Sequence, residues 1–160
     1  MRPASLGASR RSPPRGRDQG RTERYRHSQS QGLPRCLRRC RSSPVAIVSN
    51  NCEACVRAYL DHTGLSSQIQ HIEARDPAHV DRMKPSPYLL EQAAAVLRVD
   101  PRNTLLIGDQ VSDVKAAIAA GAGSIGYANK PGKADDLEAA GADAVIEDMN
   151  VLAAAVAGHS

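Results

Sequence analysis

Residues 104–113 read TLLIGDQVSD: an apolar run reaches a glycine, and two aspartates then follow, four positions apart. A short, continuous apolar run is typical of a strand that is buried on both faces, as in parallel sheets. Gln110 is a natural place for the next helix to begin, so Asp109 and Asp113 stand where the strand gives way to the helix. The stretch therefore predicts one strand–helix unit of an α/β fold, with two acids at its turn.

The predicted helix would carry Val111, Val114 and Ile118 on one face, at i, i+3 and i+7. Asp109 and Asp113 would then project away from that face, over the end of the strand. Two carboxylates about 6 Å apart repel each other by roughly 3 kcal/mol at an effective dielectric of 20. A hard cation such as Mg²⁺ between them would offset this repulsion, because it prefers oxygen ligands. The alternative is that Asp109 caps the helix and Asp113 is a solvated acid of its first turn.

The same alternation of strand and helix continues through residues 44–160. Strands are predicted at 45–49, 69–73, 104–108, 124–128 and 143–147, and helices near 51–63, 86–98, 110–120, 133–140 and 149–157. Gly64, Gly121 and Gly141 stand where three of these helices should end. Strand–helix alternation implies parallel pairing through right-handed crossovers. We therefore expect a doubly wound, Rossmann-like α/β domain over residues 44–160.

Residues 1–43 have a different composition from the rest of the chain. They hold 12 arginines and no lysine against two acids, a net charge of +10, whereas the remaining residues carry −6. The segment is rich in Pro, Gly and Ser and has no period of 2 or 3.6, so it should not bury enough surface to fold. We expect a disordered tail that contacts polyanions nonspecifically. No run approaches the roughly 18 apolar residues of a membrane span, so we expect a cytoplasmic protein without membrane contact.

Four cysteines form two short motifs, C-x3-C at Cys36 and Cys40 and C-x2-C at Cys52 and Cys55. Three interpretations of them stay open. The four thiolates could bind zinc, because paired cysteines at short spacing are the ligands of structural zinc sites. Cys52 and Cys55, at the predicted start of a helix, could form a redox pair. The simplest interpretation is that all four are free thiols of a reducing compartment.

Two further polar motifs occupy positions suited to binding phosphate. Ser49 ends the first predicted strand, and its hydroxyl, together with the free N–H groups at Asn50, would form a cradle for phosphate oxygens. Lys84 precedes Pro85, which disfavours a helix at Lys84 and keeps it in a loop. Taken singly, each motif also has an ordinary interpretation, as a helix cap or as a solvated lysine.

The order and spacing of S-N at 49–50, K-P at 84–85 and G-D-x-x-x-D at 108–113 resemble the haloacid dehalogenase-like (HAD) hydrolase superfamily, chiefly its phosphatases. In that family these are the second, third and fourth motifs, and the resemblance covers residues 44–157. It implies a HAD-like fold and hydrolysis of a small phosphorylated metabolite with Mg²⁺ as cofactor.

The resemblance also assigns a role to each motif residue. Ser49 and the backbone at Asn50 would bind the transferring phosphoryl group, and Lys84 would neutralise its charge and orient the nucleophile. Asp109 would bind Mg²⁺, and Asp113 would be a second ligand, either direct or through water.

The first motif of the family, D-x-D-x-[TV], which supplies the aspartate nucleophile, has no match, because no D-x-D occurs in the sequence. Loss of a nucleophile can lower turnover on the order of 10⁶-fold. In the family, its strand lies between the strand ending at Ser49 and the strand ending at Gly108, so two apolar edges should be left open or pair directly. We expect a truncated or inactive HAD-like hydrolase, which leaves enzyme activity undecided. The alternative is a noncatalytic module that binds phosphate, metal or polyanions.

Overall fold

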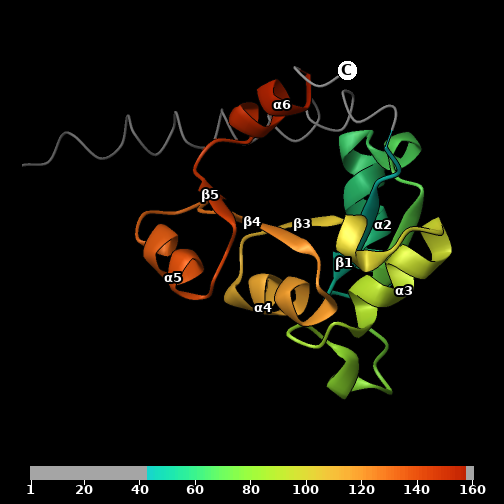
Figure 1. The fold of residues 1–160 in the computed structure, drawn as a ribbon. Coiled ribbons are helices and arrows are strands. Elements are labelled where there is room, and N and C mark those ends of the chain that lie inside the picture. Colours follow the sequence, from blue (N-terminus) through green and yellow to red (C-terminus); the bar gives the residue numbers. More distant parts are fainter. Residues whose placement is uncertain (1–42, 158–160) are drawn as a thin grey trace, which may run out of the picture.

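The computed structural model describes residues 43–157, in which parallel strands alternate with helices (Figure 1). The regular elements, in order, are β1 (Ala46–Ser49), α2 (Glu53–Thr63), β2 (His71–Ala74), α3 (Tyr88–Leu97), β3 (Leu105–Gly108), α4 (Val111–Ala120), β4 (Gly123–Tyr127), α5 (Lys133–Ala139), β5 (Ala144–Ile146) and α6 (Met149–Ala157). Short 3-10 turns lie at Ser66–Gln68, Val80–Arg82 and Pro101–Asn103. Every predicted strand and helix is present within about two residues, and Gly64 and Gly121 cap α2 and α4 in the left-handed conformation.

The strands form two parallel sheets rather than one. One sheet pairs β1 with β2, and the other has the order β3-β4-β5. Helices α3 and α4 lie on one side of the strands and α2 and α6 on the other, as a doubly wound fold requires (Figure 1). The predicted fold class is thus confirmed, and the separation of the sheets is its unusual feature.

Among residues 43–157, no strand pairs with the facing edges of β1 and β3, so both edges are open within this part of the chain. The carbonyl of Val45 accepts from Gln70 N at 2.9 Å, next to β2. Since the backbone groups of a parallel strand alternate between its two sides, those of Ala46 and Val48 face away from β2. Of the two outcomes that the sequence allowed, an open edge and direct pairing, the structure has the open edge.

The same reasoning applies to β3. The carbonyl of Thr104 accepts from Gly123 N at 3.0 Å, so the backbone groups of Leu105 and Ile107 face away from β4. Leu105 is 51% exposed and Ile107 is 37% exposed. Both residues therefore lie partly at the surface.

A shared apolar cluster joins the two sheets beneath the gap, the space between the facing edges of β1 and β3. Leu90 of α3 packs with Ala117 of α4 and with Ala122, and Val48 of β1 and Leu106 of β3 pack against them. Leu90 is 5% exposed and Ala117 is fully buried. The relative position of β1 and β3 is therefore held by the helices.

The predicted buried face of α4 is wrong in two respects. Val114 is buried as expected, but Ile118 is 53% exposed, and Asp113, expected to project away from the core, is only 5% exposed. Ala116 and Ala117 take the buried positions instead. Their small side chains let the helix lie close to the strands, where there is no room for a large residue.

Several expectations fall on residues 1–42 and 158–160, outside the described part of the chain. They are the disorder of the arginine-rich tail, its contact with polyanions, and a zinc site that includes Cys36 and Cys40. Among residues 43–157, no helix is both long enough and apolar enough to cross a membrane.

Candidate active site

Lys84 lies at the centre of the candidate site and bridges the two sheets. Its Nζ donates to the carbonyl of Val48 at 2.8 Å and forms an ion pair with Asp113 Oδ1 at 2.6 Å. The side chains of Lys84 and Asp113 are 11% and 7% exposed. The carbonyl of Val48 belongs to the open edge of β1, so the ammonium group occupies the carboxyl end of the gap between the sheets.

Asn50 holds the loop that carries Lys84. Its Oδ1 accepts from Lys84 N at 2.9 Å, and its Nδ2 donates to Lys84 O at 3.0 Å. The sequence predicted a role for the backbone at Asn50 in binding phosphate. The structure adds that the side chain of Asn50 fixes the position of Lys84 across 34 residues of sequence.

Ser49 lies at the end of β1, beside the start of α2. Its Oγ accepts from Asn51 N at 3.1 Å. A hydroxyl has one hydrogen and two lone pairs, so Ser49 can donate to an anion while it accepts from Asn51. The arrangement suits a phosphate oxygen, because Lys84 supplies positive charge at the same end of the sheet.

Asp113 uses both carboxylate oxygens within the protein. Oδ1 binds Lys84, and Oδ2 accepts from Gln110 N at 2.9 Å, as part of a capping box at the start of α4. A Cβ at Gly108 would overlap the Asp113 carboxylate, so only glycine leaves room for this acid beneath the end of β3. With both oxygens engaged, Asp113 is arranged as a positioning residue for Lys84.

Asp109 is paired with a second lysine. Its Oδ2 accepts from Lys133 Nζ at 2.7 Å, from Asn129 Nδ2 at 2.9 Å and from Gln110 Nε2 at 3.0 Å. Burial raises the pKa of Asp109, but the ammonium of Lys133 and the three hydrogen bonds outweigh it, so the pKa lies below its usual value. Asp109 is therefore an ionised carboxylate at neutral pH.

Sequence reasoning did not identify Gln110, Asn129 and Lys133 as members of the site. Asn129 had a usable signal, because it lies just past the end of β4, and the carboxyl ends of parallel strands meet at one edge of a sheet. Lys133, which opens α5, had no such signal. Its Nζ also donates to the Asp109 carbonyl at 2.6 Å, a contact that depends on the tertiary position of α5.

The donor groups fit a hard cation only in part. Asp109 offers a carboxylate, the ligand that Mg²⁺ prefers in proteins, whereas both oxygens of Asp113 already have partners. Each acid has its own lysine in place of the shared cation predicted from the sequence. Within residues 43–157, no group of three or more His, Cys, Asp or Glu side chains could hold a metal. A Mg²⁺ ion would thus take Asp109 from this chain and need further ligands from elsewhere.

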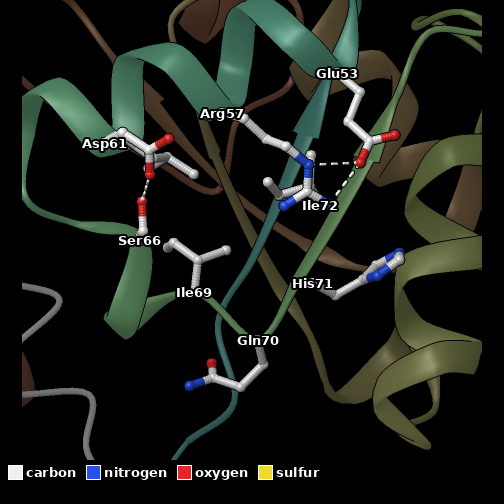
Figure 2. Close-up of a pocket in the computed structure, with 9 residues that line it drawn as sticks. Glu53, Arg57, Asp61, Ser66, Ile69, Gln70, His71 and Ile72 are labelled. Carbon is white, nitrogen blue, oxygen red and sulfur yellow. Dashed lines mark hydrogen bonds and ion pairs between the residues drawn. The ribbon is translucent and has the colours of Figure 1, made fainter.

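A hollow of the described surface lies away from these residues. Figure 2 shows it between α2 and the start of β2, with a volume of about 370 Å³. The ion pair of Arg57 with Glu53, at 2.6 Å, lies along its wall. None of the predicted site residues lines it. Chemistry at the gap between the sheets is therefore separate from this hollow.

Comparisons with known proteins agree with the fold. A family model described as HAD-hydrolase-like matches residues 82–152. The plasmid phosphoglycolate phosphatase of Cupriavidus necator is 37% identical over 114 residues, which are 69% of this chain and 47% of that protein. The phosphoglycolate phosphatase of Neisseria gonorrhoeae is 37% identical over 83 residues, or 52% of this chain and 34% of that one. The chain thus spans about half the length, or less, of these curated relatives.

Solved structures give the same result. A HAD family hydrolase from Deinococcus radiodurans, with bound phosphate and sodium, is 31% identical with a TM-score of 0.66, covering 79% of this chain and 58% of that one. A haloacid dehalogenase-like protein of unknown function from Agrobacterium tumefaciens is 30% identical with a TM-score of 0.63, covering 72% and 54%. The parallel fold and these relatives together place the chain in the haloacid dehalogenase-like hydrolase superfamily.

Proposed function

We propose that this chain carries the phosphate-binding part of a Mg²⁺-dependent phosphatase that acts on a small phosphorylated metabolite. The observation that carries the proposal is the position of Lys84, a nearly buried cation held by Asp113 and the Val48 carbonyl at the carboxyl end of the gap. A buried lysine whose ammonium group is oriented by two partners is suited to neutralising the charge of a phosphoryl group.

The other motif residues complete this part of the site. Ser49 and the backbone N–H groups at the start of α2 would donate to the phosphate oxygens. The side chain of Asn50 would keep Lys84 in place by binding the main chain of Lys84. Asp109 would be the ligand that this chain gives to Mg²⁺, with Asp113 contributing at most through water. The metal would neutralise charge that develops on the phosphoryl group.

The nucleophile, in this proposal, comes from a strand that inserts between β1 and β3. The open backbone groups of Ala46, Leu105 and Ile107 support the insertion, because each needs a partner that a central strand would provide. An aspartate at the carboxyl end of such a strand would emerge beside Lys84.

The substrate class rests on the relatives. The curated relatives from Cupriavidus necator and Neisseria gonorrhoeae are phosphoglycolate phosphatases, which supports a small phosphomonoester as the substrate of the completed site. A cytoplasmic location stays a prediction. The relatives do not favour the noncatalytic alternative, and nonspecific polyanion contact remains a property proposed for residues 1–43 alone.

Hydrolysis of an aryl phosphate, measured with and without Mg²⁺, tests the proposal. Three proteins are compared: the chain itself, a version in which residues 1–43 are replaced by a strand bearing D-x-D-x-T, and that version with Asp109→Asn. We expect Mg²⁺-dependent hydrolysis in the second protein alone. If the repaired protein folds and binds phosphate but does not turn over, the reaction assigned to the site is wrong. If the unaltered chain is active, the nucleophile lies within its own 160 residues.

A further inference from the structure

Two thiols meet at the start of α2, outside the phosphate chemistry. Cys52 is the N-cap of the helix and Cys55 lies in its first turn. Their Sγ atoms are 2.6 Å apart, and Cys55 N also donates to Cys52 Sγ at 3.4 Å. Both cysteines are free thiols, Cys55 exposed and Cys52 partly exposed. A dissolved reagent can therefore reach the pair.

The two sulfur atoms differ in their electrostatic surroundings. The hydrogen bond between the two sulfur atoms lowers the pKa of Cys52 and raises the pKa of Cys55. The nearby charge of Arg75 lowers the pKa of both, and the amino end of a helix also favours a thiolate. Cys52 is thus the sulfur better suited to attack a disulfide as a thiolate. Cys55 is suited to the later step, in which it displaces the group bound to Cys52.

The geometry also favours closure. A disulfide bond is about 2.05 Å long, so the two sulfur atoms would need to approach by only about 0.5 Å from their present contact. The backbone at Cys52 is extended, at φ −68° and ψ 150°, which directs its side chain back over the first turn toward Cys55. A four-thiolate zinc site would instead need Cys36 and Cys40, which lie outside the described residues.

We propose that Cys52 and Cys55 form a redox-active dithiol that reduces low-molecular-weight disulfides such as oxidised glutathione. The Cys52 thiolate attacks one sulfur of the disulfide, forms a mixed disulfide and releases one glutathione thiolate. The Cys55 thiolate then attacks Cys52 Sγ, closes the Cys52–Cys55 disulfide and releases the second glutathione. The protein dithiol loses two electrons, glutathione disulfide gains them, and the protons of the two cysteines end on the two glutathione thiols.

This proposal is independent of the phosphatase assignment, and its test uses the full chain with Cys36→Ser and Cys40→Ser as background. The reduced protein is mixed with oxidised glutathione, quenched with acid, alkylated and mapped by peptide mass spectrometry. We expect a Cys52–Cys55 disulfide. With Cys55→Ser added, the mixed disulfide should accumulate on Cys52. With Cys52→Ser added instead, Cys55 should react about tenfold more slowly than Cys52 does in its partner variant.

The same reactions in urea provide the reference, with circular dichroism to verify that each variant folds without urea. Unfolding should remove the advantage of Cys52, because the helix start and the charge of Arg75 no longer act on it. Equal rates for the two cysteines in the folded protein, or a Cys52 rate that urea leaves unchanged, would overturn the proposal. So would zinc retained by the unmodified chain with all its thiols protected from glutathione.

Discussion

Lys84 and Asp113 form an ion pair of 2.6 Å that connects the loop before α3 to the first turn of α4. Both side chains are nearly buried, and the lysine also binds the Val48 carbonyl of the other sheet. A buried pair of this kind costs much more to break than a surface pair, because the remaining charge lies uncompensated in a poorly solvated place. The pair therefore contributes both to the site and to the link between the two sheets.

Lys84→Met should lower the free energy of unfolding by about 3 kcal/mol, because it leaves the Asp113 carboxylate without its cation. Adding Asp113→Asn should recover part of this loss, since the amide can still accept from Gln110 N but carries no charge. Urea unfolding of the two single variants and the double variant measures the coupling. Additive effects of the two changes would contradict a direct interaction.

Asn50→Ala should weaken the binding of inorganic phosphate about tenfold, because the Lys84 loop loses two hydrogen bonds of roughly 1 kcal/mol each. Asn51→Ala is the matched control, since the side chain of Asn51 is exposed and the Ser49 contact uses only its backbone. Titration calorimetry with phosphate compares the two variants. Equal losses would mean that the Asn50 side chain does not act through Lys84.

Gly108→Ala should destabilise the protein by about 1–3 kcal/mol and also abolish phosphate binding, because the new methyl group displaces the Asp113 carboxylate. Gly64→Ala is a useful comparison. It has a positive φ of 67° but no neighbour within 4 Å, so its cost of about 1 kcal/mol is backbone strain alone. Thermal unfolding and phosphate binding together separate the two effects. Intact phosphate binding in Gly108→Ala would show that the Asp113 position is unimportant for the site.

Lys133→Gln should raise the pKa of Asp109. Burial disfavours the ionised form, and the ammonium group of Lys133, which most strongly opposes this effect, would be absent. In the unaltered chain the pKa is lowered, so the stability from ionised Asp109 is complete above the unfolded value near 4. It disappears as the pH falls through the folded value. In the variant the stability from ionised Asp109 should be smaller, and its loss should be complete at a higher pH. Carboxyl ¹³C titration between about pH 3 and pH 6 measures it, with the exposed Lys130→Gln as control.

Leu105→Lys should reduce self-association of the full chain, because Leu105 lies on the open edge of β3 and is 51% exposed. Open apolar edges pair with other chains, and an edge lysine opposes that pairing. Ile118→Lys provides a matched control, since Ile118 is equally exposed, at 53%, but lies on α4. Sedimentation velocity over a range of concentrations distinguishes the variants. An equal effect of both substitutions would point to general apolar contact rather than to the edge.

The strands and helices could be predicted from the sequence because each apolar run is short, continuous and bounded by glycine or polar residues. TLLIG at 104–108 and VAIVS at 45–49 carry this signal clearly. The edge of the sheet where the site lies could be predicted in the same way, since Ser49 ends one strand and Asp109 directly follows another.

The pairing of side chains within the site could not be predicted in the same way. Spacing along a helix placed Asp113 away from the core, over the end of the strand, whereas the structure buries it beneath β3, where Gly108 leaves room and Lys84 compensates its charge. The pairing of Asp109 with Lys133 depends on where α5 lies, which local sequence does not specify. The small residues Ala116 and Ala117 lie on the buried face of α4. They were not predicted there, because sequence patterns give most weight to large apolar residues.

The apolar cluster of Leu90, Ala117 and Ala122 has a kinetic consequence for the gap above it. Because α3 and α4 already hold β1 and β3 in place, a strand entering the gap would order only itself. Association slows when binding requires a conformational change of the receptor. Here the receptor is the folded chain, and it needs little conformational change. We therefore expect a peptide with the D-x-D-x-T motif to join the folded chain at a rate set by encounter, as split halves of a protein do when one half is already folded.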